Sequence, residues 1–242
     1  MRLKLFLFLL LNFSESFIIR EPVKCLGGLE LGTITLISGK LMDKTISKKS
    51  THRLQNQNPK LYQDGLKTSV TNLMLVGPSY YWGVENFILS HQVSNNLPLE
   101  TLLLVMIHSL GYYSVHRLMH RSDLFRKYHY FHHQFNETLI PTIGNSVSIA
   151  EFTFAYMSPF IIGCLLINPG QDSFNCAILV VSIMNLVIHT PEMSNITWSN
   201  WLVSPKTHLF HHQGKNPRST YSAPTFNLEF IYQKITDFFS RK

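Results

Sequence analysis

The stretch HRLMHRSDLFRKYHYFHH, residues 116–133, decides how this 242-residue chain is organised, because it places five histidines close together. Residues four apart on an α-helix lie on one face, so His116 and His120 can direct two imidazoles at the same point. This spacing is typical of metal ligands. A third motif, HLFHH at residues 208–212, repeats the spacing of HYFHH at residues 129–133. We therefore expect the fold to bring the three histidine motifs together.

The spacing within HYFHH and HLFHH indicates more than one metal. The first histidine of each motif shares a helical face with the closing pair, whereas the two members of the pair diverge by about 100°. One motif can therefore serve two neighbouring metals. The three motifs hold eight of the chain's 12 histidines, which exceeds the four ligands of one tetrahedral zinc site. Neutral imidazole suits Zn, Cu, Fe and Ni, and the motifs contain no carboxylate to act as the general base of an HExxH hydrolase, which favours redox chemistry.

The composition indicates a membrane protein. Only 14% of the residues are charged, compared with about 25% in soluble globular proteins, while the 45% of hydrophobic residues must be concentrated in blocks. The net charge of +7 could suggest nucleic acid. However, the basic residues flank apolar segments, so we expect an anionic membrane surface and no nucleic-acid partner. The odd, scattered cysteines, Cys25, Cys164 and Cys176, argue against a disulfide framework.

The apolar segments predict how the chain crosses the membrane. Residues 97–115 form one span that ends at the first motif, and residues 147–167 and 173–188 form a hairpin around the turn NPGQDS. Two passes return the third motif to the side of the first two, where basic residues indicate the cytosol. Residues 70–90 form a further span, interrupted by Gly77 and Pro78. We expect an all-α integral membrane protein, a bundle of about four transmembrane helices with a cytosolic, histidine-rich helical cap that holds a di-metal site.

The chain divides by composition into three regions. Residues 1–38 form a hydrophobic anchor or a signal-like region, and the pattern does not separate these two interpretations. Residues 39–69 are polar and basic without clear periodicity, which predicts a solvated loop. Residues 70–240 form the membrane domain that carries the histidine motifs.

HRLMH, HYFHH and HLFHH, in this order and with a long apolar insert before the last, resemble the three histidine boxes of the fatty acid hydroxylase/sterol desaturase superfamily. The resemblance covers roughly residues 99–237. It implies a non-haem di-iron site, with His189 as an additional ligand and Asn185 as a possible ligand to bound water. The site would comprise His116, His120, His129, His132, His133, His189, His208, His211 and His212. The usual closing pattern of the family is matched only loosely by Glu229 and Thr236, which leaves the subfamily and the substrate open.

The resemblance also implies an activity and partners. We expect a membrane enzyme of the endoplasmic reticulum, with the motifs facing the cytosol, that hydroxylates or desaturates a sterol or fatty acyl C–H bond. Two Fe ions would use O2, and electrons would come from NAD(P)H through a b-type cytochrome and its reductase. Zinc could occupy the site in purified material, because affinity generally rises from Fe to Zn.

Two other classes of protein and four further residues complete the predictions. A non-catalytic metal-binding protein, such as a transporter or a pseudo-enzyme, should place polar groups inside its spans, and here only His108, Glu151 and Asn185 lie deeper. A membrane zinc hydrolase is the weaker rival. Asp123 and Glu137 are candidates to orient imidazoles by accepting a hydrogen bond from the ring nitrogen that does not bind metal. We interpret His108 as a hydrogen-bonded helix residue.

Overall fold

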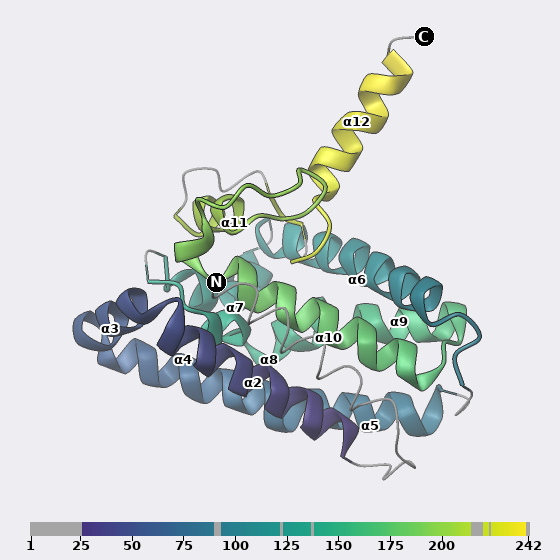
Figure 1. Ribbon diagram of the computed structural model, residues 1–242, viewed down its shortest axis with the longest axis horizontal. Coiled ribbons are helices and arrows are strands. Elements are labelled where there is room, and N and C mark those ends of the chain that lie inside the picture. Colours follow the sequence, from purple (N-terminus) through teal and green to yellow (C-terminus); the bar gives the residue numbers. More distant parts are fainter. Residues whose placement is uncertain are drawn as a thin grey trace.

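The computed structural model describes residues 26–89, 93–121, 123–136, 138–213, 220–222 and 224–240, and most of the residues in these ranges are helical (Figure 1). The only β pairing among them is an isolated bridge between Leu202 and Phe226. The prediction of an all-α chain is therefore confirmed for the described residues.

The elements follow one another with short connections. The first half contains α2 (Gly27–Thr45), α3 (Lys48–Gln57), α4 (Pro59–Thr71), η1 (Asn72–Val76), α5 (Gly77–Phe87), α6 (Leu97–Met119) and α7 (Asp123–His133). The second half contains η2 (Pro141–Asn145), α8 (Ile149–Glu151), η3 (Phe152–Met157), α9 (Ser158–Ile167), α10 (Gln171–Ile188), η4 (Pro191–Met193), α11 (Pro205–His212) and α12 (Leu228–Ser240). The π-helical segments η1 and η3 join α4 to α5 and α8 to α9 without a break.

The predicted hairpin between the second and third motifs is present. The helical segments Ile149–Ile167 and Gln171–Ile188 are the two, among the described residues, that are long and apolar enough to cross a membrane. Asn168 ends the first of them in the left-handed conformation, with φ of 44°, which Asn tolerates better than most residues. The count of about four transmembrane helices remains a prediction, because α6 does not reach the same apolarity.

The hairpin packs against α6, and α2 lies along α10 on the other side (Figure 1). Leu104 of α6, Phe160 of α9 and Phe174 of α10 meet in the largest apolar cluster of buried residues. Asn96 begins α6 by accepting a hydrogen bond from the backbone N–H of Leu99, and Ser204 begins α11 in the same way through Thr207. These caps set where the histidine-bearing helices begin.

The prediction of a solvated loop at residues 39–69 was wrong. The structure places this region in the end of α2 and in α3 and α4. Leu54 and Leu61 are buried against Phe135 and Ile143, and the side chain of Asn58 caps α4. Each of these helices buries only one narrow stripe, which includes small residues such as Gly65. A stripe of this kind gives too weak an apolar period for the sequence to reveal.

The contact between α2 and η1 depends on a glycine. A Cβ atom at Gly32 would overlap the backbone carbonyl oxygen of Leu73, whereas a Cβ atom at Gly83 would meet nothing within 4 Å. Small residues allow helices to approach closely in membranes. We expect Gly32→Ala to lower the free energy of unfolding by about 1–3 kcal/mol, and Gly83→Ala to leave it unchanged or slightly raised. Thermal unfolding of both variants in detergent tests this, and equal stability of the two would contradict the close packing.

Candidate metal centre

The nine histidines named from the sequence lie at the ends of four helices. His116 and His120 close α6, and His189 follows the last residue of α10. The second motif forms the last turns of α7, and the third forms the last turns of α11. The structure thus brings together all nine histidines named from the sequence, and seven of the nine are buried.

The nine histidines separate into two groups, within each of which the ligand nitrogens lie within 4.8 Å of one another. Cluster A contains His116, His120, His129, His133 and His211. Cluster B contains His132, His189, His208 and His212. The closing pair of each HxxHH motif is divided between the clusters, as the 100° divergence predicts. The clusters adjoin, since the rings of His133 and His212 stack with centroids 4.6 Å apart.

The nitrogen distances in cluster A fit a shared metal ion. The Nε2 atom of His116 lies 2.9 Å from Nε2 of His129 and 3.2 Å from Nε2 of His120. Two nitrogens bound to one metal at about 2.1 Å and at a right angle would be about 3.0 Å apart. Hydrogen bonding alone cannot satisfy these contacts, because each neutral Nε2 carries either one proton or one lone pair. A cation between the nitrogens satisfies all of them together.

Cluster B has the same geometry. The Nε2 atom of His208 lies 3.1 Å from Nε2 of both His189 and His212. The Nε2 atoms of His189 and His132 are 3.3 Å apart. Each cluster therefore has enough histidine ligands, and these lie close enough together, to hold one metal ion.

The other ring nitrogen of three histidines has a partner that fixes its tautomer. Nδ1 of His129 lies 2.6 Å from Oε1 of Glu151, and both side chains are buried. Nδ1 of His116 donates to the backbone oxygen of Tyr221, at 3.1 Å, and Nδ1 of His189 donates to that of Asn185, at 2.7 Å. A proton on Nδ1 leaves the lone pair on Nε2, where it faces the cluster.

The surroundings keep the imidazoles neutral. Burial lowers the pKa of His120 to about 4, and burial together with the neighbouring imidazoles lowers the pKa of His133 to about 3. Burial and nearby histidines also hold the pKa of His211 and His212 well below the ordinary value. Removal from water disfavours the charged form, and each neighbouring imidazolium would disfavour it further. At neutral pH each imidazole is therefore neutral, with one ring nitrogen that carries a lone pair available to a metal.

The remaining predicted residues lie in different surroundings. Asp123 is exposed and pairs with Arg126 at 2.6 Å, so its carboxylate does not orient an imidazole here, and Glu137 lies outside the described residues. Asn185 is buried beside His189, and its Nδ2 donates to Oδ1 of Asn145 at 3.2 Å. His108 lies outside both clusters, with its ring 4.4 Å from that of Phe160.

Glu151 is the carboxylate that the sequence did not assign to this centre. It ends α8, immediately before the π-helical segment η3, and lies at the start of an apolar span. The predicted carboxylates were those nearest the motifs in sequence, whereas Glu151 reaches His129 only through the packing of α7 on α8. The sequence gives one indication of its role: Glu151 is an ionisable residue inside an apolar segment. Such residues are energetically unfavourable there and are often functional.

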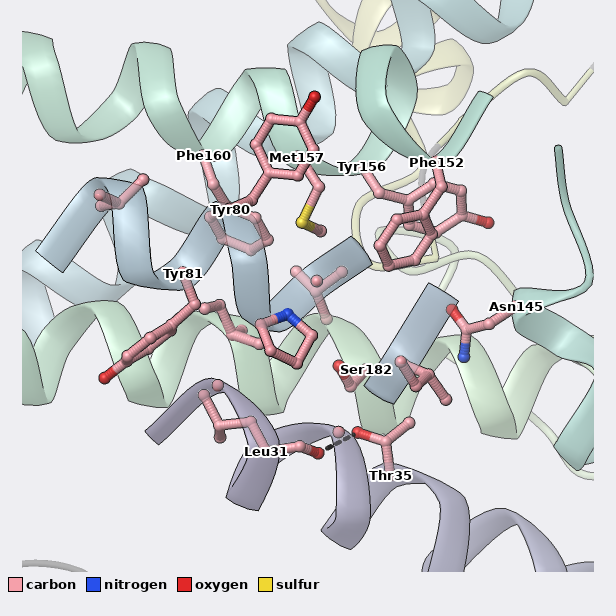
Figure 2. Close-up of a pocket in the computed structure, with 18 of the residues that line it drawn as sticks. Leu31, Thr35, Tyr80, Tyr81, Asn145, Phe152, Tyr156, Met157, Phe160 and Ser182 are labelled. Carbon is pink, nitrogen blue, oxygen red and sulfur yellow. Dashed lines mark hydrogen bonds between the residues drawn. The ribbon is translucent and has the colours of Figure 1, made fainter. Parts of the chain in front are cut away.

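A cavity lies between α2, α5, η3, α9 and α10, near cluster B (Figure 2). Its volume, as space open to a water-sized sphere, is about 70 Å³. Aromatic side chains form much of the wall, among them Tyr81, Phe152 and Phe160, and Asn145 and Asn185 also line it. The hydrogen bond of Asn185 to His189 connects this part of the wall to cluster B.

Comparisons with known proteins agree with this site. A family model described as "Fatty acid hydroxylase" matches residues 101–231, which include both clusters and Glu151. The human "Fatty acid hydroxylase domain-containing protein 2" is 27% identical over 118 residues, which is 47% of this chain and 32% of the relative. The protein of the same name from Macaca fascicularis matches to the same extent. The chain thus aligns with about one third of the length of these relatives, and no solved structure matches it.

Proposed function

Because the chain belongs to the fatty acid hydroxylase family, we propose that it is a membrane-bound, O2-dependent enzyme that hydroxylates or desaturates a lipid C–H bond. The observation that carries the proposal is the division of nine histidines into two adjoining clusters with metal-ligand spacing. We propose iron as the metal in both. Two bound iron ions would activate O2 and supply the oxidant that an unactivated C–H bond requires.

The residues of the centre have holding and orienting roles in this proposal. The imidazoles hold the metals, while Glu151 and the backbone oxygens of Tyr221 and Asn185 fix the rings that carry them. A lipid C–H bond offers no proton for acid–base catalysis, so the main task of the protein is to position the substrate. Among the residues that the structure describes, neither cluster contains a carboxylate, which favours oxidation over a hydrolase that needs a general base beside its metal.

The surface of α6 supports a place in the membrane. Leu99, Leu102, Met106 and Leu110 follow one another at helical spacing, and each is about half exposed. An apolar stripe of this kind is costly in water and favourable against lipid. Figure 1 shows α7 and α11 at the same end of the helix bundle. If α6 is a third span, the hairpin therefore returns the chain to the membrane side on which α7 lies. We propose that this side faces the cytosol, with the endoplasmic reticulum as the membrane.

The cavity supports a lipid substrate, for which we propose a sterol or a fatty acyl compound. It lies among the helices rather than at the histidine-bearing ends, and we propose that a lipid enters it from the bilayer. Its wall is mainly aromatic and aliphatic, as expected for a site that buries most of an apolar ligand.

Electrons must come from outside the chain in this reaction. We propose a b-type cytochrome and an NAD(P)H reductase as donors, docked on the side of the protein that carries the histidines. Arg117, Arg126, Lys127 and Lys206 lie in α6, α7 and α11 on that side. Such basic residues would steer an acidic donor to the surface and raise its rate of association.

The proposal is tested by lipid profiling of a host that lacks its own sterol or fatty acid hydroxylase and expresses this chain. We expect a new lipid that forms only with O2, and an 18O label in it if the product is an alcohol. Metal analysis of membranes prepared without oxygen should give two iron ions per chain. Two bound metals without any O2-dependent lipid would instead support a non-catalytic metal-binding protein.

A further inference from the structure

A groove on the outside of the protein shares a wall with the cavity. It lies between α5 and α9, and its lining includes Gly83 and Phe87 of α5. Tyr80, Val84 and Ile161 line both the groove and the cavity. These three side chains therefore separate the cavity from the surface of the protein.

The cavity is too small for a lipid as it stands. Its space open to a water-sized sphere is about 70 Å³, whereas a single water needs about 10–15 Å³ by this measure. The groove, which is open to the outside, offers about 350 Å³. A lipid chain needs more space than the cavity has, and the groove would supply it if the shared wall opened.

Tyr80 is the weakly held part of this wall. Val84 is 3% exposed, whereas Tyr80 is partly exposed. The Tyr80 hydroxyl donates to Oγ1 of Thr153 at 3.3 Å, which is long for a hydroxyl donor, since such bonds usually measure about 2.7–2.8 Å. This bond joins α5 to η3, and Figure 2 shows Tyr80 on the side of the cavity that Met157 and Phe160 form. The Tyr80 side chain thus bridges the gap between the two helices through one weak contact.

The groove is open at the next turn of α5 and lies in an apolar surface. Gly83 follows Tyr80 by three residues and so lies on the same face of the helix. A Cβ atom at Gly83 would meet nothing within 4 Å among the described residues. Beside the groove, the apolar side chains of Trp82, Phe87 and Ile162 are between 46% and 77% exposed. Such a surface is favourable against lipid and costly in water, so the groove faces the bilayer.

We propose that the groove between α5 and α9 is the entrance through which a hydrocarbon chain of a bilayer lipid reaches the cavity, and that Tyr80 closes this entrance in the structure. The inference rests on the proposed function and adds to it the route and the closing residue. Thr153 holds the closed position through its hydrogen bond to Tyr80. Opening needs the loss of that bond and the movement of one side chain. The packing of α5 on α2, and of α9 on α6, can remain as it is.

Rates of lipid binding test the proposal without requiring turnover. The purified full chain in detergent would be mixed in stopped flow with dansylaminoundecanoic acid, a fluorescent probe with a hydrocarbon chain, and the bound probe displaced by excess oleate. Gly83→Trp places an indole in the groove, because a helical side chain covers the turn that precedes it. We expect the association and dissociation rates to fall together by about tenfold or more. The Kd should stay unchanged, since Gly83 lines the groove rather than the cavity.

A second pair of variants removes the bond that holds the entrance closed. Tyr80→Phe and Thr153→Val each remove one partner and keep nearly the same side-chain volume. Each should raise both rates by about two- to fivefold, the effect of one exposed hydrogen bond. The double variant should match either single variant, because all three lack the same bond.

Leu165→Trp is the matched control, because it adds an indole to the exposed side of α9 outside the groove, and it should leave both rates unchanged. Gly83→Leu replaces the first variant if tryptophan prevents folding. No binding of the probe to the unaltered chain, or normal rates in a folded Gly83→Trp chain, would overturn the proposal. A changed Kd with a normal association rate would also overturn it, because the groove would then be a binding surface and not an entrance. Slowed binding in Gly83→Trp without lipid oxidation by the unaltered chain would refute the proposed function alone. Oxidation together with normal binding rates in Gly83→Trp would refute the entrance alone.

Discussion

Alanine at His208 or at His211 is expected to reduce lipid oxidation to the background of the host. The two residues lie one helical turn apart on α11 but belong to different clusters. His208→Ala leaves cluster B with three histidines, and His211→Ala leaves cluster A with four. We therefore expect His208→Ala to lose the metal of its cluster more completely, while both variants lose activity because oxidation needs both metals. Metal content and lipid profiles of the same membranes measure the two effects separately.

His52 provides the matched control for these variants. It is exposed on α3, where its ring lies within hydrogen-bond distance of Asn56, and it belongs to neither cluster. His52→Ala should retain both metals and full activity. If His208→Ala also retained activity at a normal metal content, cluster B would not be part of the active centre.

Glu151→Gln is expected to lower metal affinity or activity by about 10–100-fold, the usual effect of removing a partner that orients a metal-bound histidine. Glutamine keeps an oxygen that can accept from Nδ1 of His129, but a neutral amide accepts a weaker hydrogen bond than a carboxylate does. Glu151→Ala removes the acceptor as well and should have the larger effect. The affinity of cluster A for metal should fall in both variants, while lipid binding in the cavity should not change.

Asp123→Asn is the control for the carboxylate. Asp123 is exposed and bonded to Arg126, so its replacement should leave metal content and turnover unchanged. Competition with a chelator of known affinity measures the binding directly. Loss of metal in Asp123→Asn together with normal binding in Glu151→Gln would reverse the roles that the structure assigns to the two carboxylates.

The grouping of the histidines into two clusters could be predicted from sequence because their spacing is local. A helix fixes the angle between residues one, three and four apart, so HxxHH already implies that the last two histidines point to different places. The hairpin could be predicted for a similar reason, since two long apolar segments joined by a short turn must lie antiparallel. His189 was found only through the family resemblance.

The residues that surround the metal-binding histidines could not be predicted, because their roles depend on tertiary packing. Glu151 reaches His129 across 22 positions of the sequence, and the partner of His116 is a backbone oxygen that any residue could supply. The helices at residues 39–69 were missed because their buried stripe is narrow and contains glycine and serine.

The π-helical segment η3 determines how α9 is rotated about its axis relative to Glu151 and the histidine clusters. A π turn holds one residue more than an α turn, and one residue corresponds to a rotation of about 100°. Glu151 lies before this turn, and Leu165 and Leu166, which are 65% and 70% exposed, lie after it. Deleting one residue within 152–157 would leave Glu151 in place and rotate the exposed apolar side of α9 towards the protein interior. The extra residue therefore sets the rotational register between the histidine clusters and the exposed apolar side of α9.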